Sequence, residues 1–145
     1  MLFLTVSGTA SATPPEGLLI ISAKANSSGA VSNYMQGTVH SSTVDLSATQ
    51  NKKASFTITV FNNTGYTYYF DEMVWSDDAY DNKNIIPTLS GIEAKYELAN
   101  MSTVTFTVTF SYKNSSNTQN SVLNSIINYQ FVPNAEDAGD IAVHN

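Results

Sequence analysis

Two segments of the chain alternate apolar and polar residues, and they give the clearest structural signal in the sequence. In residues 53–61 every second position is apolar, and most of the intervening residues are Ser or Thr. Residues 102–113 repeat the pattern with Val104, Phe106, Val108, Phe110 and Tyr112. A period of two with β-branched and aromatic residues predicts strands. Because each strand has one apolar and one polar face, we expect an antiparallel sheet that covers a core on one side.

Weaker strand patterns occupy most of the remaining chain. They fall at residues 18–25, 34–40, 43–48, 66–75, 85–90, 96–98 and 122–132. Residues 121–128 also fit a short helix, because Leu123 and Ile127 are four positions apart. Turn-forming residues separate the strands. The pattern as a whole predicts an all-β, antiparallel β-sandwich of about eight strands, immunoglobulin-like or jelly-roll, over residues 18–134, with a tail at 135–145.

The first twelve residues have two readings. Ala10-Ser11-Ala12 has the small-x-small form of a signal-peptidase site, but no basic residue precedes it, so these residues are a signal-peptide remnant or part of the mature chain. Their apolar residues alternate in the manner of a strand, and residues 13–17 form a Pro-containing linker. An extended apolar strand can add to the open sheet edge of a neighbouring subunit, and the alternative is that it docks on its own domain. The residues expected to be donated in this way are Leu2, Phe3, Leu4 and Val6.

Composition and charge exclude several classes of function. The chain has six Lys, no Arg and a net charge of −6, so it lacks the cations that bind nucleic acid or an anionic membrane surface. No apolar stretch is long enough to span a bilayer. The absence of Cys excludes disulfides and thiolate metal sites, and in an exported protein it favours a bacterial or archaeal surface. Charged residues make up only 12%, which is typical of secreted, extracellular β proteins and predicts a cell-surface location.

Two segments support a family resemblance. The run from Ala54 to Gly65, which ends in Asn62-Asn63-Thr64-Gly65, together with residues 104–110, resembles exported prokaryotic immunoglobulin-like β-sandwich surface proteins. The strand followed by Asn-Asn-Thr-Gly is similar to the one in the TasA/camelysin group of biofilm-matrix fibre proteins. This resemblance implies fibre subunits that are joined by donated strands. Some members of the group are described as proteases, but no motif in this chain supports that activity.

Residues that could carry catalysis are scarce. The two histidines, His40 and His144, are far apart in the sequence, and no Cys is available as a nucleophile. The chain has no metalloprotease, nucleophile-elbow or phosphate-loop motif. We therefore expect a protein that is not an enzyme and that needs no cofactor.

An acidic loop is the best candidate for a metal site. Residues 76–82 contain Asp77, Asp78 and Asp81, and clustered carboxylates can supply oxygen ligands to Ca²⁺. Their spacing does not match an EF-hand loop. The alternative is a solvated hairpin tip with no ion, which is the commoner role of acidic residues in a loop.

The aromatic strand at residues 66–75 is apolar on both faces. Strict alternation places Tyr69, Met73 and Trp75 on the face opposite to Tyr66, Tyr68, Phe70 and Val74. Either the strand is covered on both sides, or the first group forms an exposed patch. Such a patch would contact a protein partner or, together with Tyr80, would stack on surface glycans.

Two kinds of covalent modification also fit the sequence. Some Gram-positive surface sandwiches, which this chain resembles in lacking Cys, join a Lys to an Asn near a buried acid. Here Lys24, Asn128 and Glu97 are the candidate isopeptide group, if the first and last long strands lie together. The alternative is that Lys24 is an exposed edge charge. Candidate glycosylation sites, which also arise by chance in an Asn/Ser/Thr-rich chain, are Asn26, Asn62, Asn100 and Asn114.

These observations together predict a non-catalytic structural subunit of an extracellular cell-surface filament or matrix. Its partners would be other copies of the chain, which assemble into a homopolymer by donation of the N-terminal strand. The alternative is a carbohydrate-binding or adhesin module of a secreted surface protein. The two hypotheses differ in whether the purified chain polymerises or binds glycans.

Overall fold

The computed structural model describes residues 15–49, 51–75, 84–118 and 120–134. This part of the chain forms nine strands in two antiparallel sheets, with one 3₁₀ turn, η1 (Leu46–Ala48), and no α-helix. The strands are β1 (Leu18–Ala25), β2 (Ala30–Gln36), β3 (Val39–Asp45), β4 (Lys53–Asn62), β5 (Tyr68–Trp75), β6 (Ile85–Ser90), β7 (Glu97–Leu98), β8 (Thr103–Tyr112) and β9 (Val122–Pro133). The prediction of an all-β antiparallel sandwich is confirmed.

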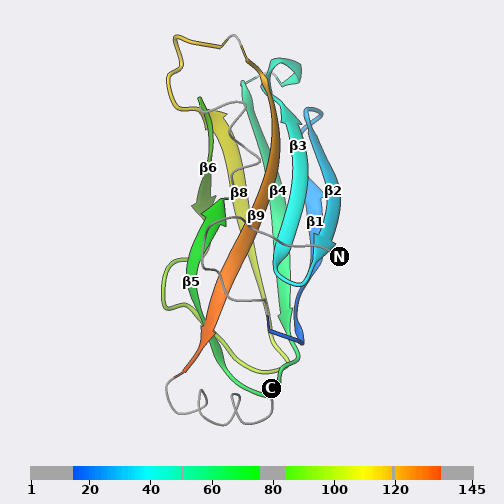
Figure 1. The fold of residues 1–145 in the computed structure, drawn as a ribbon, viewed down its shortest axis with the longest axis vertical. Coiled ribbons are helices and arrows are strands. Elements are labelled where there is room, and N and C mark those ends of the chain that lie inside the picture. Colours follow the sequence, from blue (N-terminus) through cyan, green and yellow to red (C-terminus); the bar gives the residue numbers. More distant parts are fainter. Residues whose placement is uncertain (1–14, 50, 76–83, 119, 135–145) are drawn as a thin grey trace.

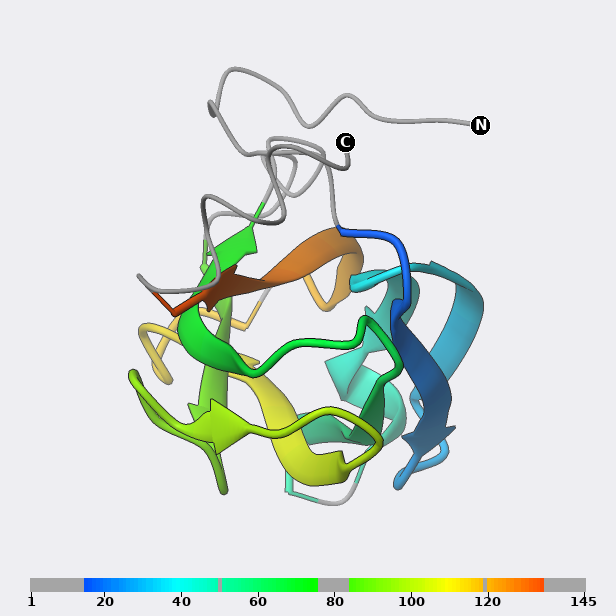
Figure 2. The ribbon, with the colours of Figure 1, turned by 90° about the horizontal axis from the view of Figure 1, so that it is seen from below.

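The two sheets pack face to face (Figures 1 and 2). One sheet has the order β1-β4-β8-β6, and the other has the order β2-β3-β9-β5-β7. The two strongly alternating segments of the sequence, β4 and β8, are direct neighbours, paired from Lys53 opposite Ser111 to Phe61 opposite Thr103. Their apolar residues share the inner face, and their Ser and Thr residues share the outer face.

One predicted strand is wrong, and the alternative of strand or helix that the sequence left open near residues 121–128 is decided in favour of strand. A strand at residues 34–40 is wrong, because Gly37, with φ of +58°, lies in the turn that joins β2 to β3. Only a residue without a Cβ adopts this conformation at little cost. Residues 122–132 form strand and not helix, because β9 pairs with β3 on one side and with β5 on the other.

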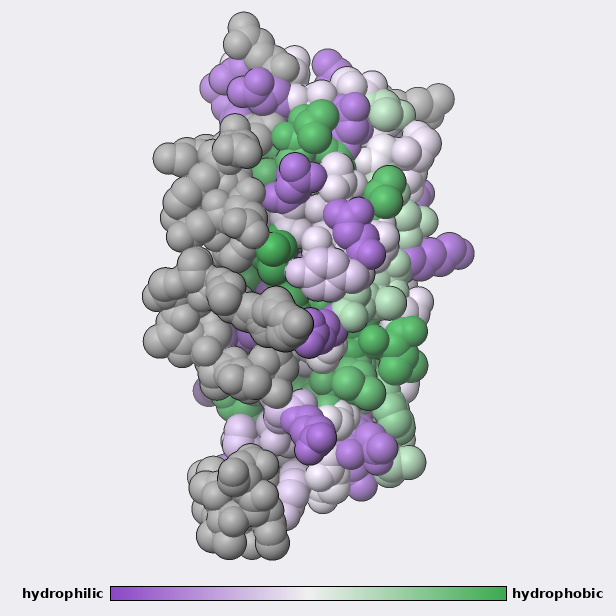
Figure 3. Space-filling view, turned by 45° about the vertical axis from the view of Figure 1, so that its right-hand side comes forward, coloured by the Kyte–Doolittle hydropathy of each residue, from purple (hydrophilic) through white to green (hydrophobic). Residues whose placement is uncertain are grey.

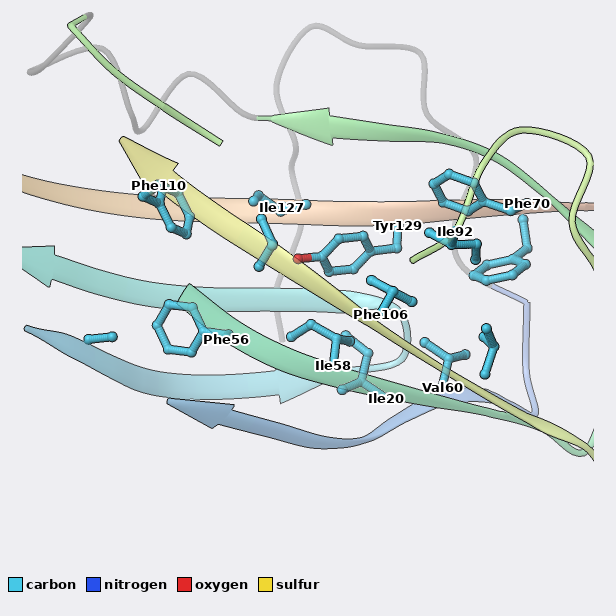
Figure 4. Close-up of a cluster of buried hydrophobic side chains, with 14 of the residues drawn as sticks. Ile20, Phe56, Ile58, Val60, Phe70, Ile92, Phe106, Phe110, Ile127 and Tyr129 are labelled. Carbon is cyan, nitrogen blue, oxygen red and sulfur yellow. The ribbon is translucent and has the colours of Figure 1, made fainter. Parts of the chain in front are cut away.

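The core lies between the sheets and is rich in aromatic residues (Figure 4). Phe106 of β8 contacts Tyr129 of β9 edge to face, with ring centroids 5.0 Å apart, and Phe56 contacts Phe110 in the same manner. Edge-to-face pairs of this kind stabilise a core beyond the burial of their surface. The Phe106–Tyr129 pair therefore joins the two sheets, and the Phe56–Phe110 pair joins neighbouring strands of the four-stranded sheet.

A buried asparagine, Asn62, connects the end of β4 to neighbouring segments. The side-chain amide of Asn62 donates to the carbonyl oxygens of Tyr66 and Leu98 at 2.8 and 2.9 Å. Its carbonyl oxygen accepts hydrogen bonds from the backbone N–H and the hydroxyl of Thr64. Asn62 thereby joins the end of β4 to the turn before β5 and to β7. The sequence indicated only a turn here, because buried bonds to distant carbonyls leave no local pattern.

Candidate functional site

The described part of the sandwich has four edge strands, and two of them lie on the same side of the molecule. These are β1 of the four-stranded sheet and β2 of the five-stranded sheet, on the right in Figure 1. The two strands are linked where the N–H of Ile20 donates to the carbonyl oxygen of Gly37 at 2.8 Å. We refer to β1 and β2 together as the β1–β2 side.

Exposed apolar residues are concentrated on the β1–β2 side. Of nine large hydrophobic side chains that are exposed in the described residues, five belong to these two strands. They are Leu19, Ile21, Val31, Tyr34 and Met35. Figure 3, which brings this side forward, shows hydrophobic surface on it. Exposed apolar groups that gather in one region indicate an interaction surface, whereas scattered ones need no explanation.

A β-bulge changes the predicted faces of the aromatic strand. The register of β5 against β9 shifts between Phe70 and Glu72. Beyond the shift, Met73 lies opposite Tyr129 and Trp75 lies opposite Ile127, and both pack against the core. Tyr69, before the shift, lies on the outer face, opposite Val132. The predicted face shared by Tyr69, Met73 and Trp75 is therefore wrong.

The bulge also explains why alternation places apolar residues on both faces of β5. A bulge inserts one extra residue, so the inward positions change from even to odd numbers along the strand. The consecutive acidic residues Asp71 and Glu72, both exposed, were the signal that could have indicated it. Tyr80, the fourth residue of the predicted contact, lies outside the described residues.

The structure separates the three residues of the predicted isopeptide group. Lys24 is exposed on β1 of one sheet, whereas Asn128 is buried on β9 of the other sheet. The Asn128 side-chain oxygen accepts a hydrogen bond from the hydroxyl of Thr38 at 2.7 Å. Glu97 is exposed on β7. The prediction that the first and last long strands are adjacent is wrong, because β9 lies between β3 and β5, and the cross-link it required is not supported.

His40 is the one titratable base in the described core. Its Nε2 is hydrogen-bonded to the hydroxyl of Ser32 at 2.8 Å, and its ring packs edge-on against Phe56. Burial lowers the pKa of His40 from 6.5 to about 4, because the charged imidazolium loses its hydration. His40 is therefore neutral at physiological pH.

This Ser–His pair lacks the other parts of a nucleophilic site. Activation of a serine needs a base that a third group orients, and a site that a substrate reaches. Among the hydrogen bonds of the described residues, none reaches the other ring nitrogen of His40, and His40 is almost fully buried. The pair is explained by the need of buried polar groups for partners. The expectation that the chain is not an enzyme stays a prediction.

Four other buried polar groups of the described residues have no hydrogen-bond partner. They are the hydroxyls of Ser27, Ser125 and Tyr129 and the indole N–H of Trp75. Burial also raises the pKa of the Tyr129 phenol, so this group stays protonated. Each unpaired group costs free energy unless a water molecule satisfies it. No local sequence pattern indicates these unpaired groups, because a hydrogen-bond partner depends on which distant segments pack around each side chain.

The candidate glycosylation sites differ in accessibility. Asn26, Asn100 and Asn114 are exposed. Asn62 is fully buried, and both of its amide hydrogens are used in the bonds to Tyr66 and Leu98 described above. A glycan on Asn62 is incompatible with this fold, so that prediction is wrong for the folded chain.

The acidic loop cannot be compared with its prediction, because Asp77, Asp78 and Asp81 lie outside the described residues, as does His144. Within the described ranges, no group of three His, Asp or Glu side chains is arranged to hold a metal ion. In the same ranges, no helix is long and apolar enough to cross a membrane.

The fold and this surface define the chain as an all-β sandwich with an apolar, open-edged side. No protein-family model, no curated protein and no solved structure matches the chain. Its function is therefore argued from its own residues.

Proposed function

We propose that this chain is a non-catalytic structural subunit of an extracellular cell-surface filament or matrix, and that it assembles by donation of its N-terminal strand. The observation that carries the proposal is the gathering of exposed apolar side chains along the open edges of β1 and β2. An open edge presents unpaired backbone groups that bind an added strand. The strand-like pattern of Leu2, Leu4 and Val6 supplies a donor of matching chemistry.

The absence of charge in the donor segment supports this role. Residues 1–14 contain no charged side chain, so their addition to a sheet edge buries no ion. Residues 7–17 separate the apolar segment from β1, and when extended they reach about 36 Å. This length is sufficient for the donor of one subunit to reach a neighbour.

The test is the state of association of the purified chain. The full chain is expected to form long assemblies, seen by light scattering and electron microscopy, and deletion of residues 1–12 is expected to abolish them. Leu4→Asn should weaken assembly strongly, while the matched variant Thr5→Asn should not, because only Leu4 belongs to the apolar alternation. Polymer that survives the deletion, or a full chain that stays monomeric, contradicts the proposal.

The second hypothesis, a carbohydrate-binding module, has less support. It relied on Trp75 being available for stacking on a sugar, and this residue packs against the core. Binding to a glycan array that Tyr69→Ala abolishes would favour that function, since Tyr69 lies on the outer face of its sheet.

A further inference from the structure

The four edge strands differ in how well they are protected against pairing with another chain. Natural edges are blocked by charged residues, by Pro, by bulges or by being very short. β6 contains Pro87, and β7 has only two residues, one of them Glu97. β1 carries Lys24. β2, with the sequence AVSNYMQ, has neither a charged residue nor a proline, and its one protective feature is the bulge between Ser32 and Tyr34.

The backbone of β1 is partly occupied, whereas that of β2 is open. The N–H of Ile20, beside the bulge in β1, already donates to Gly37. In β2, the N–H of Ala30 donates to Ser27. For residues 31–35, the described structure contains no backbone hydrogen bond outside the ladder with β3. This leaves an open edge of five residues, interrupted only by the bulge between Ser32 and Tyr34.

The side chains along this edge are apolar and exposed. Val31 and Tyr34 lie on the outer face, opposite Thr43 and Ser41, and are 56% and 46% exposed. Met35 lies opposite the buried His40, on the inner face, and is still 43% exposed. An inward-facing side chain at this exposure shows that the sandwich is uncovered along β2. Ile21 of β1, next to the Ile20–Gly37 hydrogen bond, is also exposed on this side.

We propose that β2 is the acceptor edge, and that residues 2–6 of a second copy of this chain pair with residues 31–35. This inference rests on the proposed function, since it names the place where the donated strand binds. The donor has five residues and the open edge has five, and both are uncharged. Alternation places Leu2, Leu4 and Val6 on one face of the donor, where they would cover Met35 and Ile21. The five-stranded sheet would thereby gain a sixth strand.

Engineered cysteines test this pairing directly, because the chain has no native Cys. A disulfide requires Cα atoms within about 7 Å, which residues opposite one another on paired strands satisfy. Thr5→Cys is placed in one copy. The other copy carries one cysteine on one of the four edges, at exposed positions. These variants are Tyr34→Cys on β2, Ser22→Cys on β1, Thr88→Cys on β6 and Glu97→Cys on β7. Phe3→Cys replaces Thr5→Cys in a second series, to cover a shift in register by two residues.

After mixing and mild oxidation, non-reducing gels are expected to show heterodimer with Tyr34→Cys at about tenfold the yield given by the other three edges. A heterodimer yield with Ser22→Cys, Thr88→Cys or Glu97→Cys that equals or exceeds the yield with Tyr34→Cys would overturn the choice of β2 and leave strand donation intact. Homodimer of Tyr34→Cys alone, in place of heterodimer, would show that two β2 edges pair with each other, and would overturn the proposed occupant.

Two further outcomes separate this inference from the proposed function. If the full chain polymerises but no edge cross-links to Thr5→Cys or Phe3→Cys, the acceptor assignment is wrong. If the chain is monomeric and the double variant Thr5→Cys/Tyr34→Cys forms only an intramolecular disulfide, both proposals fail. The N-terminal segment would then cover β2 of its own subunit.

Discussion

The buried histidine makes the stability of this protein depend on pH in a way that one substitution should reveal. In the folded chain the pKa of His40 is about 4, and in the unfolded chain it is the ordinary 6.5. Between these values the unfolded state binds a proton that the folded state does not. The stabilisation from neutral His40 is therefore complete above pH 6.5 and is lost progressively as the pH falls towards 4.

The magnitude follows from the separation of the two pKa values. At about 1.4 kcal/mol per pH unit, full protonation of the unfolded state costs about 3 kcal/mol of unfolding free energy by pH 4, and about 2 kcal/mol by pH 5. This is a large share of the 5–15 kcal/mol that is typical of a domain. His40→Gln keeps a polar partner for Ser32 and removes the titration.

The assay is urea denaturation, followed by Trp75 fluorescence, of both proteins from pH 7.5 to pH 4. His40→Gln is expected to be less stable at pH 7.5, because it loses the contact with Phe56, but its stability should fall less in acid. Asp45, whose pKa is lowered chiefly by the hydrogen bond from Ser47, also loses stabilisation in acid. That loss occurs in both proteins and cancels in the comparison.

His144→Gln is the matched control, because it removes the other histidine of the chain. It should leave the pH dependence of stability as it is in the unmodified protein. Parallel stability curves for the unmodified protein and His40→Gln would refute the argument, since they would mean that burial does not hold His40 neutral. Loss of the pH dependence of stability in His144→Gln would also refute the argument, because it would show that His144 and not His40 is responsible.

Three further outcomes are expected from the same denaturation assay. Asn62→Ala should destabilise by about 2–4 kcal/mol, because the carbonyl oxygen of Leu98 loses its buried donor and that of Tyr66 keeps only the hydroxyl of Thr64, whereas the exposed Asn63→Ala should change stability by less than about 0.5 kcal/mol. Tyr129→Phe should be neutral or stabilising, since its hydroxyl has no partner; a loss above about 1 kcal/mol would reveal a buried water. Trp75→Ala, which removes the single Trp of the chain and is therefore followed by circular dichroism together with Tyr69→Ala, should cost about 2–3 kcal/mol and more than Tyr69→Ala; the reverse order would contradict the inward position of Trp75.

The class of fold could be predicted from the amino-acid sequence alone. The alternation in β4 and β8 is a local property, because successive side chains of any strand point to opposite faces. Two strands with one apolar face can be stable only when a second layer covers that face. The inward residues Phe56, Ile58 and Phe106 could therefore be named before the structure was known, and they are buried in it.

The sequence also indicated the chemistry of assembly but not its place. The uncharged, alternating N-terminal segment can be read without a partner. The open edge cannot be derived in this way, because a strand is recognised as an edge only when the pairing of all the other strands is known. Among the described strands β2 pairs only with β3, which makes β2 an edge strand. The other side of β3 pairs with β9, which is more than 75 residues away along the chain.

Tertiary structure alone decided the features that depend on partner strands. A bulge is defined by the register against a neighbour, so the inward turn of Met73 and Trp75 could not be derived from alternation. For the same reason Lys24 and Asn128 were wrongly placed together. The shift in the pKa of His40 depends on Phe56 and the opposite sheet. The alternation of residues indicates which face of a strand is buried. The segment that covers this face is decided only by contacts between parts of the chain that are far apart in sequence.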